Sequence, residues 1–323
     1  MDKSKIAREY RAKYGWDVPT HRLASIMHSE NPVFTSKEDA REALRYIEGK
    51  KGEKRRKFGM RPDIKRDLNP YKLPDFDKRE RKPFVLPKQC DNILVLADLH
   101  CPYTHIPSLN KAIKYGLDNK INTIILLGDV LDNHQISSYC SDPSRRNQEE
   151  EFAICKEMLK RFRELFPKAH IYWLKGNHDI RWERYIQTRT KEISMMKHFH
   201  MEEVLKLHEE EIFVIDDKTI VQAGGLTFHH GHHFFGRVAP VYAAKTLWDK
   251  TNLDIMIGHC HTHQTYEKAT LNGVKRTYIL GCLSEIGLNV DYNPIVNQYR
   301  RGFAHVKIEG DSYYAEMIRG VED

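Results

Sequence analysis

Long apolar runs are missing from this sequence of 323 residues, and no stretch approaches the roughly 18 consecutive apolar residues of a membrane span. The N-terminus contains several lysines, but no apolar segment of the kind found in signal peptides follows them. Hydrophobic residues make up 40% of the chain, which at this length is enough to bury a sizeable core. We therefore expect a cytoplasmic globular protein with no membrane contact.

Cysteine is scarce and shows no pairing pattern. The six cysteines are scattered, without the Cys-x-x-Cys pair or the dense spacing of small secreted domains. This argues against a disulfide scaffold and against a structural zinc site built from thiolates. We expect free thiols in a reducing compartment. Cys101 and Cys260 lie inside polar clusters, either as spacers or as residues that touch a site.

Acidic residues are fewer than basic residues only in the N-terminal part of the chain. The net charge is +7, yet residues 1–90 carry 24 Lys and Arg against 14 Asp and Glu, whereas residues 91–323 carry 28 against 31. This asymmetry indicates a separate basic module that meets a polyanion. We predict a helical module at 1–57, a proline-containing linker at 58–90 and a larger domain at 91–323.

The N-terminal module has the pattern of three short helices, at 3–14, at 21–29 after a cap at Thr20, and between Ser36 and Gly49. A basic third helix with a basic tail is compatible with a helix-turn-helix type of nucleic-acid binder. It is also compatible with a solvated charged face on a helical appendage. The candidate nucleic-acid contacts are Arg41, Arg45, Lys50, Lys51, Lys54, Arg55 and Arg56.

The larger domain opens with alternating strands and helices. Residues 92–97, 123–127 and 170–174 are continuous apolar runs, as expected of central strands that are covered on both faces. Helical patterns at 108–120 and 149–166 separate these strands. The alternation predicts a parallel sheet with right-handed crossovers.

The C-terminal half changes to short strands joined by turns. After a helix at 195–211 we expect strands at 211–215, 219–223, 226–230 and 254–257, with a further helix at 239–249. An Asn-Gly hairpin follows at Asn272-Gly273. Two closing strands flank Glu309-Gly310-Asp311. These elements predict a second, largely antiparallel sheet.

Polar clusters follow five of the strands. Because the carboxyl ends of strands are where α/β proteins keep their chemistry, we expect these clusters to meet. They contain seven oxygen or imidazole donors, namely Asp98, His100, Asp129, Asn177, His230, His259 and His261. If one carboxylate bridges, the set supplies two metals with four protein ligands each. Mixed nitrogen and oxygen ligands suit Mn²⁺, Fe or Zn²⁺ better than Ca²⁺.

The motifs that carry these donors resemble those of the calcineurin-like metallophosphoesterase superfamily. Asp-x-His, Gly-Asp-x-x-Asp, Gly-Asn-His-Asp, His-Gly and Gly-His-x-His occur in that order within residues 92–318. The resemblance implies an α/β fold, a four-layer sandwich of two mixed β-sheets flanked by helices, with the N-terminal module outside it. It also implies a dinuclear centre, for which Mn²⁺ is the first expectation and Fe or Zn²⁺ the alternatives.

The same resemblance assigns the ligands to two ions. One ion would be held by Asp98, His100 and His261, and the other by Asn177, His230 and His259. Asp129 would bridge the two ions, and a hydroxide between them would attack phosphorus in line. Among several neighbouring histidines, the resemblance selects His230 as the ligand, because the histidine ligand of the family directly precedes a glycine. The other histidines would support the ligands or lie at the surface, namely His229, His232, His233 and His263.

Further roles follow from the resemblance for residues beside the ligands. His178 would protonate the leaving oxygen, Asp179 would orient its ring, and Asp132 would support the loop. Arg181 and Arg184 follow the Gly-Asn-His-Asp turn, and their interleaving with aromatic residues suits a phosphate flanked by a base, although the aromatics could equally pack into the core.

Differences between this sequence and known subfamilies restrict the class of substrate. Protein serine/threonine phosphatases carry Arg after Gly-Asp-x-x-Asp and Glu after Gly-Asn-His, where this sequence has Asn133 and Asp179. This counts against a phosphoprotein substrate. The tail at 281–303 is similar to phosphoesterases encoded by bacteriophages, which would place the protein in the cytoplasm of an infected bacterium.

Three functions remain. The first, which we predict, is a metal-dependent phosphodiesterase, nuclease-like, that the basic module brings to DNA or RNA. The second is a phosphomonoesterase that acts on a nucleotide or a small phosphorylated metabolite. The third is a binding protein with a vestigial site, which the complete set of expected ligands disfavours.

Overall fold

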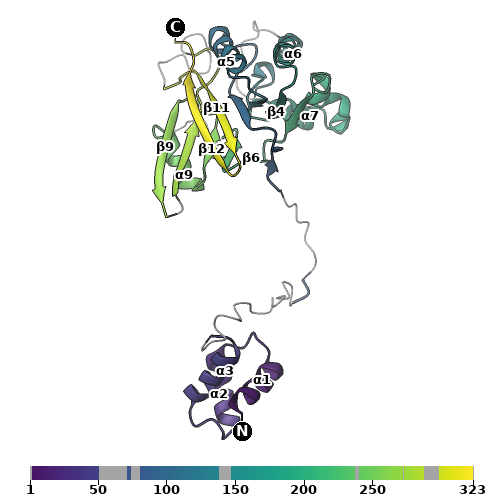
Figure 1. Ribbon diagram of the computed structural model, residues 1–323. Helices are drawn as coiled ribbons and strands as arrows, with labels where there is room; N and C mark the ends of the chain where they lie inside the picture. The colour runs from purple at the N-terminus through teal and green to yellow at the C-terminus, as the bar shows by residue number, and fades with distance from the viewer. Residues whose placement is uncertain are drawn as a thin grey trace. The chain divides into compact units, whose positions relative to one another are not determined.

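The computed structural model describes residues 2–50, 71–73, 81–137, 147–236, 240–271, 273–286 and 298–322. The chain divides into two compact units, Met1–Lys78 and Arg79–Asp323 (Figure 1). Most of the predicted linker lies outside the described residues, as do Lys51, Lys54, Arg55 and Arg56. Among the helices that the structure describes, none has the length and apolarity needed to cross a membrane.

The N-terminal unit consists of three short helices around one small core. The helices are α1 (Lys3–Tyr14), α2 (Thr20–Glu30) and α3 (Lys37–Ile47), as the sequence predicts. Ser36 caps α3 as expected, because its hydroxyl accepts a hydrogen bond from the backbone of Asp39 at 3.1 Å. The predicted cap of α2 is wrong, since Pro19 occupies the N-cap and Thr20 is the first helical residue.

A buried ion pair ties these three helices together. Arg11 of α1 donates from Nε to Glu48 Oε1 at 3.0 Å, and Thr20 of α2 donates to Glu48 Oε2 at 2.9 Å. Only 5% of the Arg11 side chain and 2% of the Glu48 side chain are exposed. Burial raises the pKa of Glu48, but hydrogen bonds from Lys50, Arg11 and Thr20 outweigh burial and lower the pKa below its ordinary value. The carboxylate therefore stays charged inside the unit.

The first sheet of the larger unit has the strand order β12-β11-β2-β3-β4-β5. Its strands are β2 (Asn92–Leu96), β3 (Thr123–Leu126), β4 (His170–Leu174), β5 (Ile212–Ile215), β11 (Gly302–Glu309) and β12 (Ser312–Arg319). Strands β2 to β5 pair in parallel, and β11 joins β2 antiparallel. The sequence-based placement of 211–215 in the second sheet is wrong, because β5 continues the parallel edge beside β4.

The second sheet has the order β1-β6-β7-β8-β10-β9. Its strands are β1 (Phe84–Val85), β6 (Val221–Ala223), β7 (Leu226–His229), β8 (Ile255–Ile257), β9 (Gln264–Thr270) and β10 (Gly273–Ile279). The sheet is mixed rather than largely antiparallel, because β1 with β6, β7 with β8, and β8 with β10 all pair in parallel. Strand β1 lies inside the predicted linker, so the ordered domain begins before residue 91.

Helices cover the outer faces of the sheets. They are α5 (Ile106–Asp118), α6 (Gln148–Leu165), α7 (Arg181–Arg189), α8 (Met201–Val204) and α9 (Ala243–Thr251). The expected long helix at 195–211 is wrong, since this segment forms short turns and the single turn of α8.

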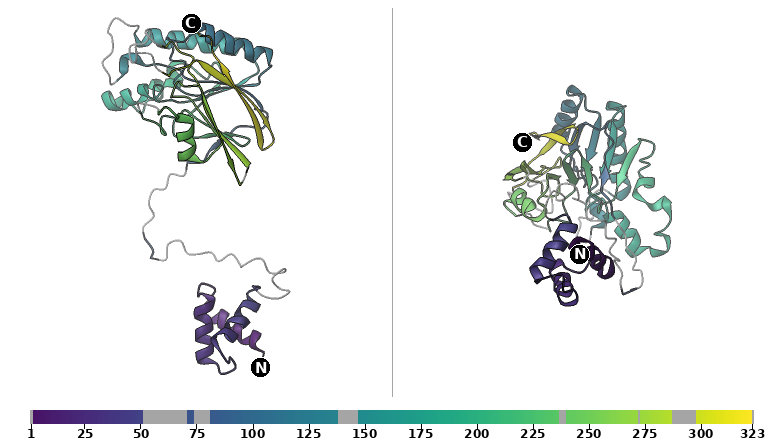
Figure 2. Two further views of the ribbon diagram at one scale, coloured as in Figure 1. Left: turned by 90° about the vertical axis from the view of Figure 1, so that its left-hand side faces the viewer. Right: turned by 60° about the horizontal axis from the view of Figure 1, so that its bottom comes forward.

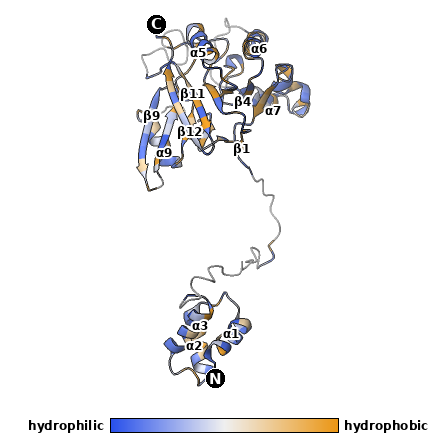
Figure 3. Cartoon of the chain, viewed as in Figure 1, coloured by the Kyte–Doolittle hydropathy of each residue, from blue (hydrophilic) through white to orange (hydrophobic). Residues whose placement is uncertain are grey.

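Alternating side chains along the strands create four layers (Figure 2). Ile93 and Val95 of β2 pack between the sheets with residues of β7 and β8, whereas Leu94 and Leu96 face α5 and α6. Helix α9 covers the outer face of the second sheet. Figure 3 shows hydrophobic residues along buried strands such as β4 and mainly hydrophilic residues on α1. The predicted four-layer sandwich is confirmed.

The ion pair of the N-terminal unit yields a test of stability. Replacing Glu48 with glutamine leaves the buried guanidinium of Arg11 without an opposite charge, which should cost about 3–5 kcal/mol. Hydrogen–deuterium exchange of peptides from α1 to α3 in the full-length protein measures this loss as faster exchange. Glu38→Gln, at the exposed pair with Arg41, serves as the control and should leave exchange unchanged. Equal exchange in the two variants would contradict the role of the buried pair.

Candidate active site

The predicted ligands meet where strands of both sheets end. Strands β2, β3 and β4 run in parallel in one sheet, and β7 and β8 run in parallel in the other. The loops that follow these five strands carry Asp98, His100, Asp129, Asn177, His230, His259 and His261. The structure brings all seven side chains together in two neighbouring groups.

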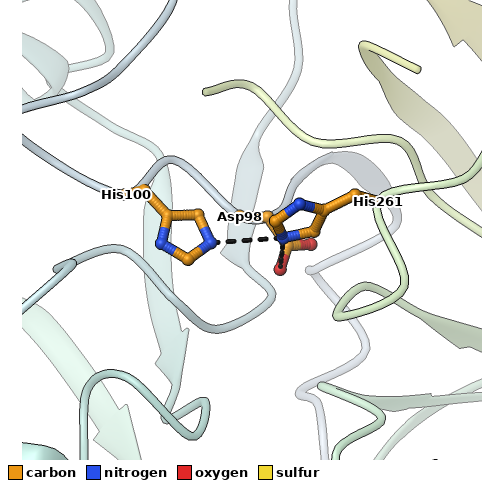
Figure 4. A group of neighbouring side chains, drawn as sticks. All are labelled: Asp98, His100 and His261. Atoms are coloured by element: carbon orange, nitrogen blue, oxygen red, sulfur yellow. Dashed lines mark hydrogen bonds and ion pairs between the residues drawn. The ribbon is translucent and has the colours of Figure 1, made fainter. Parts of the chain in front are cut away.

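The first group consists of Asp98, His100 and His261 (Figure 4). His261 Nε2 lies 3.2 Å from Asp98 Oδ1 and 3.2 Å from His100 Nε2. All three residues are buried. Ligands that bind one ion at about 2.0–2.2 Å lie roughly 3 Å apart, so the observed spacing fits a shared divalent cation.

The second group surrounds His230. Its Nε2 atom lies 3.1 Å from Asp129 Oδ2 and 3.2 Å from Asn177 Oδ1. One ring nitrogen of His259 lies within 4.8 Å of the ligand atoms of Asp129 and His230. The Nδ1 atom of His230 lies 2.8 Å from the carbonyl oxygen of Leu127, which directs Nε2 toward the other donors.

Asp129 connects the two groups. Its Oδ2 atom lies 3.1 Å from His230 Nε2 in one group and 4.0 Å from His100 Nε2 in the other. Its Oδ1 atom accepts a hydrogen bond from the backbone of His178 at 2.7 Å, which fixes the carboxylate. One carboxylate between two sets of buried nitrogen and oxygen donors fits two divalent cations.

Several ligands have an unusual backbone conformation. The φ angles of Asp98, His100, Asp129, His259 and His261 lie between 47° and 64°, in the left-handed region that residues other than glycine seldom adopt. Such conformations gather at functional sites, where the surrounding structure holds them.

Glycines allow the loops to approach one another. A Cβ atom at Gly176 would lie 2.2 Å from Asp129 Oδ1 and 2.5 Å from the backbone nitrogen of Asp129. At Gly258, a Cβ atom would lie 2.5 Å from Asp98 Oδ2. Both contacts are too short for any side chain, so glycine at these positions is a condition for the ligand geometry.

Buried charges in the site balance one another. Burial raises the pKa of Asp129, but the charges of His230 and His178 outweigh burial and hold that pKa well below its usual range. Burial lowers the pKa of His230, but Asp129 outweighs burial and raises it to about 10. A cation that entered the site would take the place of the proton on His230, so we expect metal binding to release protons.

The ring of His178 is oriented by Asp132. His178 Nδ1 lies 2.9 Å from the carbonyl oxygen of Asp132 and 3.2 Å from its Oδ1 atom. The same Oδ1 atom lies 2.9 Å from Nδ1 of His100. Asp132 therefore orients both a candidate ligand and the candidate proton donor, which is a larger role than the loop support predicted for it.

Asp179 does not contact the ring of His178 among the described residues, in contrast to the expectation from the resemblance. Its carboxylate instead accepts four hydrogen bonds of 2.8–3.0 Å, from the backbone of Asp129, Leu131 and Gly176 and from Trp173 Nε1. Burial and the charge of Asp129 raise its pKa to about 6. The carboxylate of Asp179 therefore links the loop after β3 to the loop after β4 by hydrogen bonds.

Of the two candidate arginines, only Arg181 reaches the site in the structure. Its Nη2 atom lies 3.0 Å from His178 Nε2, and its Nη1 atom donates a hydrogen bond of 2.9 Å to the carbonyl oxygen of Asp132. Arg184 is exposed on α7. Trp182, one of the aromatic residues interleaved with these arginines, packs against Phe152 with ring centroids 5.1 Å apart.

Sequence reasoning missed Glu151. This residue of α6 is 2% exposed, and it accepts a hydrogen bond from the backbone of Asn133 at 2.6 Å. The side chain of Asn133 in turn donates to the carbonyl oxygen of His178 at 2.9 Å. Burial raises the pKa of Glu151 to about 8. In the sequence it stands in an acidic first helical turn, which is an ordinary solvated pattern, so no signal distinguished it.

The glycine contacts predict the effect of adding one methyl group. Gly176→Ala should displace Asp129 and weaken the binding of divalent cations by about 10- to 100-fold, because residues that orient metal ligands contribute this much to affinity. Isothermal titration of the metal-stripped protein with a divalent cation would measure this change. Gly236→Ala is the matched control, since a Cβ atom there meets nothing within 4 Å. Equal cation affinity of both variants would show that the close approach is unimportant.

Comparisons with known proteins place this site in a family. Residues 92–283 match the family model described as calcineurin-like phosphoesterase. No curated protein matches the chain.

Solved structures that are similar to this chain share little sequence with it. A double mutant of Vps29 from Entamoeba histolytica is 16% identical, with 71% of this chain and 99% of that chain covered and a TM-score of 0.35. The phosphoesterase YfcE from E. coli is 13% identical, with coverages of 71% and 100% and a TM-score of 0.36. A dimetal phosphatase from Danio rerio is 10% identical, with coverages of 72% and 97% and a TM-score of 0.35.

The family model spans more than half of the chain, from the first strand of the parallel sheet through all seven candidate ligands. On this evidence, the chain belongs to the calcineurin-like phosphoesterase family.

Proposed function

We propose that this protein hydrolyses phosphodiester bonds in nucleic acid with the help of two divalent cations, of which Mn²⁺ is the first to test and Fe or Zn²⁺ are alternatives. The observation that carries the proposal is the position of the Asp129 carboxylate between the two ligand groups. When bound, the ions would polarise the phosphate ester and lower the pKa of a water molecule.

The residues that would hold the ions are those of the two groups. Asp98, His100 and His261 would bind one ion, and Asn177, His230 and His259 the other, with Asp129 shared. Their donors are carboxylate, amide and imidazole, without thiolate, which favours Mn²⁺ over ions that select sulfur.

His178 is suited to transfer a proton to the leaving oxygen. Burial lowers its pKa, but Asp129 and Asp132 outweigh burial and raise the pKa above the ordinary value, with Arg181 opposing them. Arg181 lies 3.0 Å from Nε2, the nitrogen that would face a leaving group. A substrate phosphate would therefore draw Arg181 away from His178 and free Nε2 for the proton transfer.

The distribution of charge supports an extended polyanion as substrate. Residues 1–90 have a large excess of Lys and Arg, whereas residues 91–323 have a slight excess of Asp and Glu. Arg41 and Arg45 are exposed on α3. The N-terminal unit would thus hold DNA or RNA by its phosphates, while the larger unit supplies the hydrolytic site.

Metal-dependent diester cleavage tests the assignment of the site. After metal stripping and addition of Mn²⁺, the wild type should cleave a bis-aryl phosphate diester, and Asp129→Asn should abolish this turnover because it removes the shared carboxylate. Asp311→Asn, at an exposed turn, is the control and should remain active. Near-normal turnover by Asp129→Asn would refute the site.

The same experiment separates the proposal from its alternative. Cleavage of the matching monoester with no cleavage of the diester would indicate a phosphomonoesterase for a nucleotide or small metabolite. The slightly acidic larger unit is the observation that favours this alternative, because it offers little attraction to a long polyanion.

Removal of residues 1–78 tests the role of the basic unit, and it retains strand β1 in the remaining chain. The truncated protein should bind DNA or RNA more weakly and with a flatter dependence on salt, by about 0.9 in the log–log slope for each phosphate that it no longer neutralises. Hydrolysis of a small diester should be unchanged. Fluorescence anisotropy at several salt concentrations measures the binding.

Two double variants that remove the same amount of charge refine this test. Arg41→Gln with Arg45→Gln should weaken binding, whereas Lys111→Gln with Lys114→Gln, on the exposed side of α5, should have little effect. Equal binding by the full-length and truncated proteins would exclude the N-terminal unit as a nucleic-acid contact.

A further inference from the structure

A group of metal-ligand side chains lies outside the two groups of the active site. It consists of Asp217, in the turn between β5 and β6, and of His232 and His233, in the turn after β7. One ligand atom from each residue lies within 4.8 Å of the others. The proposed function uses none of these three residues.

The spacing of the donor atoms matches a tetrahedral ion. Asp217 Oδ2 lies 3.4 Å from His232 Nε2 and 3.2 Å from His233 Nε2. Zinc bonds of about 2.0–2.1 Å in a tetrahedron place neighbouring ligand atoms roughly 3.3 Å apart. Two of the three separations thus already have the value that a shared zinc ion requires.

His232 provides an independent indication of a ligand. Its side chain is only 8% exposed, and within the part of the chain that the structure describes Nδ1 makes no hydrogen bond, while Nε2 has only the long contact of 3.4 Å with Asp217 Oδ2. A buried imidazole usually has partners for its nitrogens. The ring instead directs Nε2 at the carboxylate that also faces His233, which is the arrangement of a ligand whose ion would complete its contacts.

The backbone holds this group in place. His229 accepts a hydrogen bond at Nδ1 from Gly231, so its Nε2 carries the proton and donates to the carbonyl oxygen of Asp217 at 3.1 Å. The turn that presents the two histidines is closed by a hydrogen bond of 2.8 Å from Phe234 to Gly231. Both sides of the group are therefore anchored to β7.

The group is separate from the active site but adjacent to it. The ring of His232 has its centroid 5.4 Å from that of His230 and 6.2 Å from that of His259. The side chain of His233 is 40% exposed and gives the group an opening to solvent. An ion could enter from this side without passing through the dinuclear site.

We propose that Asp217, His232 and His233 form a third cation site, which binds Zn²⁺ through one carboxylate oxygen and two imidazole nitrogens and leaves the fourth position to water. Imidazole ligands favour Zn²⁺ and other late transition metals over Mg²⁺ or Ca²⁺. The site does not depend on the proposed substrate, because it uses none of the ligands of the dinuclear centre.

Zinc stoichiometry tests this site directly. Full-length protein without an affinity tag is stripped with a chelator and dialysed against a low, fixed concentration of free Zn²⁺, and the bound zinc is counted by elemental analysis and native mass spectrometry. His233→Ala and Asp217→Asn should each bind one zinc ion fewer per chain than the wild type. His208→Ala, at an exposed histidine elsewhere, should bind the same number as the wild type.

A second variant separates the third site from the catalytic centre. Asp129→Asn should lose zinc from the dinuclear centre and should still lose one further ion when His233→Ala is added. Equal zinc content of the wild type, His233→Ala and Asp217→Asn would overturn the proposal, whatever the activity of the enzyme. Circular dichroism of each variant verifies that the fold is retained, and His233 is the preferred position because its side chain is partly exposed.

Anomalous diffraction at the zinc edge provides a structural test. Crystals of the zinc-loaded wild type should show a peak at about 2.0–2.2 Å from Asp217 Oδ2, His232 Nε2 and His233 Nε2. A peak bound only to His233 at the surface, or no peak in this group, would also overturn the proposal.

Discussion

The active site depends on the buried carboxylate of Asp179. It accepts hydrogen bonds from the backbone of Asp129 and Leu131, after β3, and of Gly176, after β4, and thereby joins two loops that are almost 50 residues apart in sequence. Trp173 adds a fourth bond from the strand itself. A buried carboxylate with this number of donors is stable only while all of them stay in place. The position of the shared ligand Asp129 thus follows from a residue that supplies no ligand atom to either group.

Electrostatic compensation explains why the remaining site is built from histidine. The carboxylates of Asp98, Asp129 and Asp132 are fully or almost fully buried, and such charges require cations or hydrogen-bond donors nearby. Imidazole supplies either a proton or a metal ligand, so the same side chains can balance the carboxylates with and without bound ions. The left-handed backbone of several ligands is a local cost that the two packed sheets support.

The two units differ in charge and in the size of their apolar cores. The N-terminal unit has a small apolar core, and its buried pair of Arg11 and Glu48 adds a polar link between helices that few apolar contacts hold. The larger unit buries two extended apolar layers, which make its strand ends rigid enough to position ligands. Nucleic-acid affinity and hydrolysis would accordingly be separable properties under the proposed function.

Local patterns in the sequence determined the helices of the N-terminal unit and the buried strands, because apolar periodicity is encoded in short segments. The four layers and the choice of His230 among the neighbouring histidines came from the resemblance of the motifs to a known family. The tertiary structure decided which side chains meet. It paired His178 with Asp132 rather than Asp179, buried Glu151, moved β5 to the parallel sheet and selected Arg181 over Arg184. It also gathered Asp217 with His232 and His233. These contacts depend on loop conformations and on distances between remote segments, which no local pattern encodes.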